Sequence, residues 1–256
     1  MKYLHSLLFL LIGLSLDAQS KNEFTKTSFS KELSFIRIDS INSSQSTVVE
    51  YPKFLVVIEL PMKNSGGGKA TDLEEDIPKA ERYLQFLQKE YPNKPVKYVL
   101  STHWHLHSLS GITPFFNSGA KLVTAKSNWD YSVKNGLFKG KDVQKLAKNT
   151  IQITKDSTLL GKTKFPIQVL FLDKTYTHKP TTDYLFFYMP KDKNLHASCM
   201  CAMSEIDFKE QPDFTYSDRI TDIEKSIKSR NIEVKNILKM YLDFDKTKKR
   251  IQTTRY

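Results

Sequence analysis

The sequence predicts an α+β protein in which two β-sheets pack face to face and helices cover their outer surfaces. Alternating and β-branched segments at residues 33–60 predict two or three antiparallel strands. A long amphipathic segment at residues 72–91 predicts a helix, and further strands then alternate with shorter helical segments. Strands and helices both carry apolar faces, and stacking the sheets between helices buries all of these faces.

The best-defined element is the helix expected at residues 72–91. Asp72 can cap its N-terminus, and Glu74 and Glu75 suit the positive end of the helix dipole. Apolar side chains recur at helical spacing, namely Ile77, Ala80, Tyr83, Leu84 and Leu87. Pro92 ends the helix, which therefore presents one apolar face to a sheet.

Strands and two more helices fill the rest of the chain. The expected strands are residues 96–101, 120–125, 152–161, 164–172, 183–189, 195–200 and 234–240, and the expected helices are residues 127–133 and 218–230. A glycine-rich loop at residues 61–71 precedes the long helix. Lys69 in this loop is followed by Ala70 rather than by Ser or Thr, so the loop lacks the pattern of a phosphate-binding loop.

The N-terminus has the order of features that is typical of a secretory signal. Lys2 comes first, an apolar run follows at residues 7–16, and the small residue Ala18 comes after it. The run is shorter than the roughly 20 residues that a transmembrane helix requires. We therefore expect a signal peptide at residues 1–18, a single domain at residues 19–256, and export to the periplasm or the exterior.

The net charge of +11 suits a polyanion, an anionic lipid surface or an acidic substrate. The lysines are scattered, however, and they cluster only at residues 246–255. Aromatic residues do not alternate with basic ones in the way that stacks nucleobases. We expect a basic surface without a nucleic-acid partner, and the composition leaves the oligomeric state open.

Half of the six histidines lie in one five-residue stretch of the segment STHWHLHSLSGI, at His103, His105 and His107. Imidazole is the commonest metal ligand, and alternate positions of an extended segment place side chains on one side. At the end of the strand expected at residues 96–101, the backbone can turn these rings toward one cation. The alternative is that the three histidines form an ordinary polar surface.

Further ligands must come from distant parts of the chain. His178 lies in a loop between two expected strands, and His196 lies three residues before Cys199. Because these two positions face opposite sides of an alternating strand, we expect Cys199 to face a site and His196 to face solvent or a helix. Cys199 and Cys201 are too close on a strand for a relaxed disulfide, so we interpret them as free thiols or as a thiolate ligand with its neighbour.

The segment Thr102 to Gly111, THWHLHSLSG, resembles the Thr-His-x-His-x-Asp-His-x-x-Gly hallmark of the metallo-β-lactamase-fold superfamily of metal-dependent hydrolases. The resemblance covers roughly residues 45–200 and includes the segments NKPVKYVLST, FFNSGAKLVTAKSN and THKPTTDYLFFYMPKDKNLHASC. It implies an αββα four-layer sandwich of two mixed β-sheets flanked by helices, with the site at one edge between the sheets.

The resemblance also implies a set of metal ligands. His103, His105 and His178 fall on the family's three-histidine zinc site. Cys199 falls on a ligand of its second metal site. Zinc on three histidines with an open fourth position activates water, whereas a fourth protein ligand makes the metal inert.

Three departures from the family pattern concern the second site. His107 replaces the hallmark aspartate, and Ser108 replaces a ligand histidine. The family also supplies a late histidine, but here no histidine follows His196. Serine is a poor zinc ligand, so this site keeps His107 and Cys199 at most, and one zinc per chain is expected.

Two functions remain open. The first is an exported hydrolase of a small molecule (a lactam, ester, thioester or phosphoester), in which His107 accepts a proton or binds metal. In that case Lys126 or Lys179 could hold an anionic group of the substrate. The second is a non-catalytic protein that keeps the fold and binds a ligand or a partner, because fold alone does not establish catalysis.

Overall fold

The computed structural model describes residues 23–38, 45–60, 62, 73–138, 140–172, 183–201 and 216–238. At residues 73–75, 106, 107, 199, 201 and 216–221 it describes the backbone alone. The expected signal peptide, the segment that holds His178 and the basic tail lie outside these residues, as does the glycine-rich loop apart from Met62.

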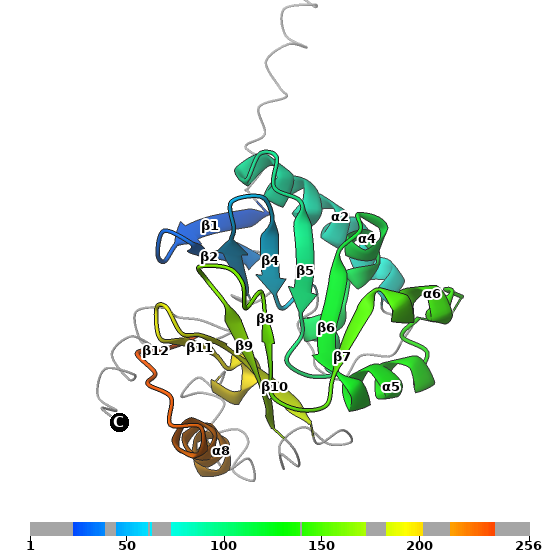
Figure 1. Cartoon of the computed structure of the whole chain (residues 1–256). Coiled ribbons are helices and arrows are strands. Elements are labelled where there is room, and N and C mark those ends of the chain that lie inside the picture. The colour runs from blue at the N-terminus through cyan, green and yellow to red at the C-terminus, as the bar shows by residue number, and fades with distance from the viewer. Residues whose placement is uncertain are drawn as a thin grey trace, which may run out of the picture.

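The larger sheet has seven strands among the described residues, and they follow one another in chain order (Figure 1). They are β1 (Phe24–Ser28), β2 (Leu33–Ile38), β3 (Gln45–Glu50), β4 (Leu55–Ile58), β5 (Val96–Leu100), β6 (Lys121–Ala125) and β7 (Thr150–Ile153). Neighbours from β1 to β4 are antiparallel, and neighbours from β4 to β7 are parallel. The parallel half needs crossover connections, and helices supply them.

The smaller sheet has five strands in the described part of the chain, in the order β12-β11-β10-β9-β8. They are β8 (Ser157–Leu159), β9 (Ile167–Leu172), β10 (Tyr184–Met189), β11 (Asn194–His196) and β12 (Asn236–Leu238). All pairs are antiparallel except β11 with β12. Both sheets are therefore mixed, as the sequence predicted.

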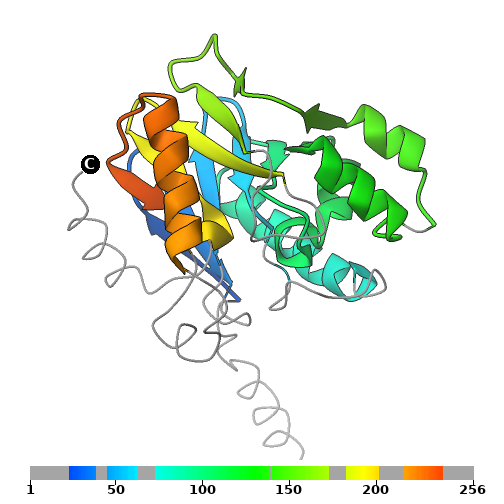
Figure 2. The ribbon, with the colours of Figure 1, turned by 90° about the horizontal axis from the view of Figure 1, so that it is seen from below.

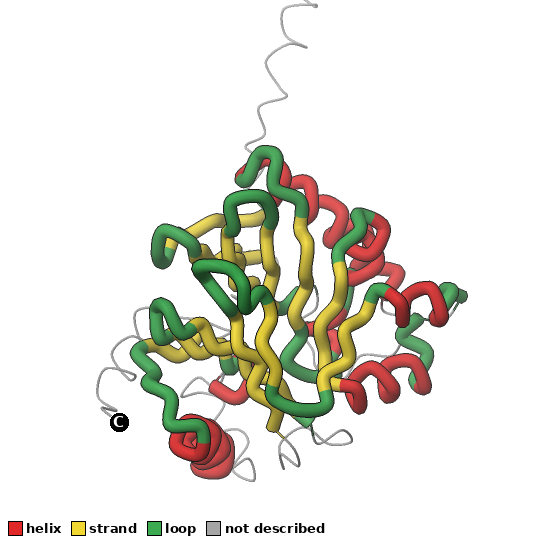
Figure 3. Tube along the Cα trace, viewed as in Figure 1, coloured by secondary structure: helices red, strands yellow, loops and turns green. Residues whose placement is uncertain are grey.

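Helices cover the two outer faces, and Figures 2 and 3 show them on opposite sides of the strands. The helices beside the larger sheet are α2 (Leu73–Glu90), α4 (Ile112–Asn117), α5 (Lys126–Lys134) and α6 (Val143–Lys148). The smaller sheet is covered by α8 (Tyr216–Ser229). None of the described helices is both long and apolar enough to cross a membrane.

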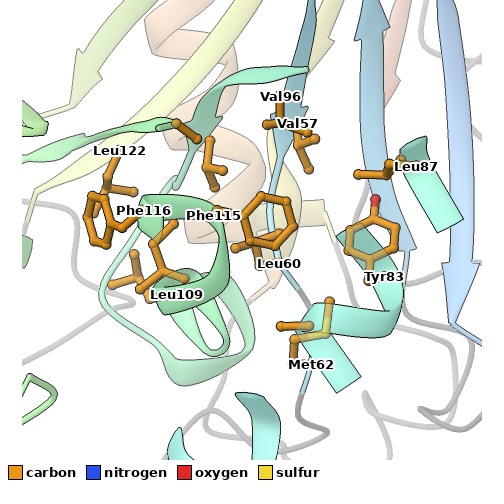
Figure 4. Packing of buried hydrophobic residues seen from close by; sticks show 14 of the residues in the cluster. Val57, Leu60, Met62, Tyr83, Leu87, Val96, Leu109, Phe115, Phe116 and Leu122 are labelled. Carbon is orange, nitrogen blue, oxygen red and sulfur yellow. The ribbon is translucent and has the colours of Figure 1, made fainter. Parts of the chain in front are cut away.

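Three buried apolar clusters fill the spaces between these four layers. The first joins α2 and α4 to the larger sheet through side chains such as Tyr83 and Phe115, and Figure 4 shows part of it. The second lies between the sheets and includes Ile58 and Phe187, and the third lies under α8. Burying one such side chain fully stabilises the fold by roughly 1.5–3 kcal/mol. The two sheets and the clusters on both sides of them confirm the layered α+β fold that the apolar patterns predicted.

The expected helix at residues 72–91 is confirmed as α2, and the expected strands appear within a few residues of their predicted positions. One prediction needs division, because residues 152–161 contain the end of β7 and all of β8, which belong to different sheets. Asp156 marks this crossing: its carboxylate binds Arg230 through two hydrogen bonds and accepts the backbone N–H of Phe171. The edge strand β1 and the short helices α4 and α6 were not predicted.

Candidate metal site

The candidate site lies where parallel strands β4, β5 and β6 reach their carboxyl ends. Strand β5 stops at Leu100, residues 102–105 form a bend, and the short helix α3 (Leu106–Leu109) follows. The expectation that the histidines alternate on an extended segment is therefore wrong. Ser101 Oγ donates to the carbonyl oxygen of His103 (2.9 Å), and the N–H of Ser108 donates to that of His105 (2.9 Å), which closes the bend.

The bend brings two of the predicted ligands together. His103 Nε2 and His105 Nδ1 are 3.0 Å apart, and their ring planes meet at 73°. Two imidazole nitrogens that bind one tetrahedral zinc at 2.0–2.1 Å stand about 3.3 Å apart. A small outward movement of either ring thus gives the ligand spacing, and this pair fits a zinc ion.

His103 is fully buried and is held on its ring face as well. Its ring stacks on that of Tyr184 from β10, with centroids 5.1 Å apart and planes at 17°. The hydroxyl of Tyr184 donates to the carbonyl oxygen of Ala197 (3.0 Å), just before Ser198. The N–H of Leu185 donates to the carbonyl oxygen of Thr102 (2.9 Å), so the smaller sheet holds the histidine bend in place.

A buried glutamate that was not predicted lies behind the bend. Glu59 follows β4 with a φ of 67°, and its carbonyl oxygen accepts a hydrogen bond from Ser46 Oγ (2.7 Å). Its Oε1 accepts from both the N–H (3.0 Å) and the hydroxyl (2.5 Å) of Thr102. Burial raises the pKa of Glu59 to about 7, and the hydroxyl groups around it offset part of that effect.

Ser108, which replaces a histidine of the hallmark, points into the protein. It is fully buried, and its Oγ lies 2.7 Å from Ser101 Oγ. Its backbone carbonyl oxygen also accepts the N–H of Leu60 (3.4 Å). The hydroxyl of Ser108 thus belongs to an internal hydrogen-bond pair rather than to a metal-facing surface.

The other predicted ligands are placed by backbone only or lie outside the described residues. The backbone of His107 is in α3, and that of Cys199 is in the 3-10 helix η3 (Ser198–Cys201) just after β11. His178 and Lys179 lie outside the described residues. Among the described residues, no group of three or more His, Cys, Asp or Glu side chains could hold a metal.

Two further expectations concern Lys126 and His196. The Lys126 side chain is 54% exposed and forms an ion pair with Asp130 (2.5 Å), and its role in holding a substrate anion stays a prediction. The expectation that His196 faces solvent or a helix is wrong, because its side chain is fully buried. From β11, His196 pairs with Phe187 of β10 and with Leu238 of β12. Paired residues share a face of the sheet, and both partners belong to the cluster between the sheets, so His196 faces that space.

Helix α5 lies beside the candidate ligands and contacts both β10 and Trp104. Ser127 Oγ at the start of α5 donates to Oδ2 of Asp183 (2.5 Å), the residue directly before β10. The ring of Trp104 lies edge-on to the rings of both His105 (4.4 Å) and Tyr131 of α5 (4.8 Å). Trp104 is half-buried, so one aromatic ring contacts a candidate ligand at the border between interior and surface.

No family model matches the chain, and no curated protein matches it in sequence. Solved structures do match over most of its length. A metallo-β-lactamase from Pontibacter korlensis is 18% identical and covers 84% of this chain and 90% of its own, with a TM-score of 0.61. The metallo-β-lactamase DIM-1 is 16% identical and covers 90% and 98%, with a TM-score of 0.60.

A third similar structure is the metallo-β-lactamase FIM-1 from Pseudomonas aeruginosa in a mono-zinc form. It is 12% identical and covers 90% of this chain and 95% of its own, with a TM-score of 0.59. The chain has the metallo-β-lactamase fold, which confirms the predicted architecture.

Proposed function

We propose that the protein is an exported metal-dependent hydrolase with one zinc ion on His103, His105 and His178 and without a working second metal site. The observation that carries this proposal is the approach of His103 Nε2 to within 3.0 Å of His105 Nδ1 at the strand ends of a metallo-β-lactamase fold. Export is proposed from the signal-like N-terminus, and the substrate is proposed to be a small molecule.

When bound, zinc supplies an activated water, with a pKa near 7, and polarises a carbonyl or phosphoryl oxygen. The residues of the chain hold the metal and transfer the proton. His103, stacked on Tyr184 and closed off from solvent, is the rigid ligand. His105 lies at the half-exposed border where a substrate can approach. His107, one residue into α3, would accept the proton, since an unperturbed histidine has a pKa near 6.5.

Two observations support a single metal ion. Ser108 is buried against Ser101, so this position presents no metal-facing side chain. FIM-1, a protein of the same fold, has been crystallised in a mono-zinc form. His107 and Cys199 remain as the proposed remnant of the second site.

The first experiment measures zinc binding. We expect about one zinc per chain in untagged protein, lost in His103→Ala, His105→Ala and His178→Ala. His196→Leu, which also removes one histidine, should keep the metal. Metal analysis after dialysis gives the stoichiometry, and a metal-free, well-folded wild type would contradict the proposal.

Tryptophan fluorescence reports binding at the same site. The chain has two tryptophans, and Trp104 contacts His105 whereas Trp129 is buried against Phe138. Adding zinc to the metal-free protein should change the emission of Trp104. The change should vanish in Trp104→Phe, while Trp129→Phe should keep it.

The second experiment separates the hydrolase from a non-catalytic binding protein. We expect turnover in a panel of lactam, ester, thioester and phosphoester substrates, abolished by chelation and by His103→Ala. His107→Gln should retain zinc and lose turnover if His107 is the base. Zinc binding without turnover of any class would favour the non-catalytic alternative.

A further inference from the structure

A chain of hydrogen bonds leads from the buried Glu59 to the candidate metal position. Glu59 Oε1 accepts the hydroxyl of Thr102 (2.5 Å), Thr102 Oγ1 lies 2.7 Å from His103 Nδ1, and His103 Nε2 lies 3.0 Å from His105 Nδ1. Glu59, Thr102 and His103 are fully buried, so water does not compete for these contacts.

The direction of the bonds follows from the number of hydrogens available. The hydroxyl of Thr102 has one hydrogen, and it goes to Glu59 Oε1. Thr102 Oγ1 can then only accept from its other neighbour, so His103 Nδ1 must carry a hydrogen. Because Oε1 also accepts the N–H of Thr102, a proton on Glu59 belongs on Oε2, and this direction holds in both charge states of the carboxyl group.

The backbone keeps the carboxylate in this position. The N–H of Glu59 donates to the carbonyl oxygen of Leu100 (2.8 Å), the last residue of β5, and its carbonyl oxygen accepts from Ser46. Glu59 is thus fixed between the ends of two strands, because Ile58 pairs with Leu100 and this register places Glu59 one residue before the level of Thr102. A fixed acceptor of this kind selects one of the two neutral forms of a histidine.

We propose that Glu59 and Thr102 are positioning residues that hold His103 with its hydrogen on Nδ1, so that the lone pair of Nε2 points at His105 and at the metal position. In the metal-free protein this lone pair accepts the Nδ1 hydrogen of His105. Metal binding then requires His105 to exchange that hydrogen with water and carry one on Nε2 instead. The metal consequence rests on the proposed function, but the form of His103 does not.

The test is a long-range ¹H–¹⁵N NMR spectrum of the metal-free full chain with ¹⁵N-labelled histidine. We expect His103, assigned by the loss of its signals in His103→Gln, to show a protonated Nδ1 and an unprotonated Nε2. Thr102→Val keeps the shape of the side chain and removes the hydroxyl, so His103 should become a mixture of both forms. Thr102→Ser should restore the wild-type spectrum.

Zinc affinity, measured by competition with a chromophoric chelator, gives the second readout. Loss of an outer hydrogen-bond partner of a ligand histidine typically weakens affinity 10–100-fold, and we expect a loss in that range for Thr102→Val. Thr102→Ser should stay close to the wild type. Ser101→Ala is the matched control, because Ser101 contacts the carbonyl oxygen of His103 rather than its ring.

A protonated Nε2 on His103 in the wild type would overturn the proposal, and so would a Thr102→Val variant with unchanged spectrum and affinity. If the wild type binds no zinc but shows the predicted spectra, the positioning role stands and the hydrolase proposal fails. If Thr102→Val does not fold, as judged by circular dichroism, the wild-type and Thr102→Ser spectra still decide the form of His103.

Discussion

At the scale of single residues, His103 is the most constrained side chain of the candidate site. Thr102 lies at one nitrogen, His105 at the other and the Tyr184 ring on one face. These partners come from the bend after β5 and from β10, so two sheets meet at one imidazole. A ring held in this way is pre-organised to bind a cation, which keeps the ordering cost of binding low.

Ser108 allows a direct test of whether the second metal site is lost by more than one substitution. Ser108→His restores the hallmark residue but places a ring where a buried hydroxyl pairs with Ser101. We expect it to lower the free energy of unfolding by about 1–3 kcal/mol through overpacking, without adding a second zinc. Urea denaturation and metal analysis measure the two effects.

The control for this variant is Ser108→Ala, which removes the hydroxyl without adding bulk. It should cost about 1 kcal/mol, the usual value of one hydrogen bond. A Ser108→His protein that is as stable as the wild type and binds two zinc ions would show that the second site is intact apart from this position.

The sequence predicted His103 and His105 as a pair because their spacing is a local pattern. Glu59 was not predicted, since a single acidic residue after an apolar strand looks like an ordinary strand end until the fold brings Thr102 to it. His196 was assigned to the wrong face because the strand was assumed to run through Cys199. It ends at His196, and the 3-10 helix that begins at Ser198 breaks the alternation.

At the scale of elements, periodicity predicted the long helices and most strands, whereas α4, α6 and β1 were missed. Helix α4 has six residues, fewer than two turns, and the β1 segment FTKTS has one apolar residue, so neither shows an apolar period of its own. Tertiary contacts define them instead. The ring centroids of Phe24 in β1 and Tyr83 in α2 are 5.3 Å apart, and Phe115 of α4 belongs to the same buried apolar cluster as these two rings. Helix α4 follows the bend and the short helix α3, so its packing on α2 supports the site.

Gly111 precedes α4 and, after α3, brings the chain against Ala80 of α2. It has a φ of 74°, and a Cβ there would lie 2.6 Å from Ala80 Cβ and 2.9 Å from Met62 Cγ. Gly111→Ala therefore adds a clash to the strain of a left-handed backbone, and we expect it to lower the free energy of unfolding by about 2–4 kcal/mol. Thermal and urea unfolding of the purified protein measure this.

Gly119→Ala is the matched control for this prediction. Gly119 also has a positive φ, 91°, but an added Cβ would meet nothing within 4 Å. Only the backbone strain should remain, about 1–2 kcal/mol. Equal effects of the two substitutions would mean that the contact between α2 and α4 is not tight at Gly111.

At the scale of the whole molecule, two buried titratable groups oppose each other in the pH dependence of stability. Burial raises the pKa of Glu59 from 4.5 to about 7 and lowers that of His196 from 6.5 to about 3. Neither ring nitrogen of His196 has a hydrogen-bond partner among the described residues, so nothing there compensates a charge on it. Both groups lie where strands of the two sheets end, and both favour the uncharged form.

The sign of each effect follows from proton binding. Between pH 4.5 and 7 folded Glu59 keeps a proton that the unfolded chain releases, so its contribution falls as the pH rises. Between pH 3 and 6.5 the unfolded chain binds a proton at His196 that the folded protein rejects, so that contribution rises with pH. Each slope is at most about 1.4 kcal/mol per pH unit, and the two largely cancel between pH 4.5 and 6.5.

Single substitutions should separate the two slopes. In His196→Leu, the free energy of unfolding of the metal-free protein should fall from about pH 5.5 to 7, because His196 no longer opposes the Glu59 term there. Below that range Glu23 and Glu32, whose pKa values are lowered by Arg82 and Lys191, add a contribution that rises with pH. In Glu59→Gln the free energy of unfolding should rise with pH up to 6.5, because the opposing Glu59 term is absent. Urea denaturation at half-unit pH steps measures both curves.

Phe187→Leu is the control, because it changes a buried neighbour of His196 that has no titratable group. It should shift the wild-type curve by the same amount at every pH. Curves for His196→Leu and Glu59→Gln that run parallel to the wild type would mean that neither group stays uncharged in the folded protein.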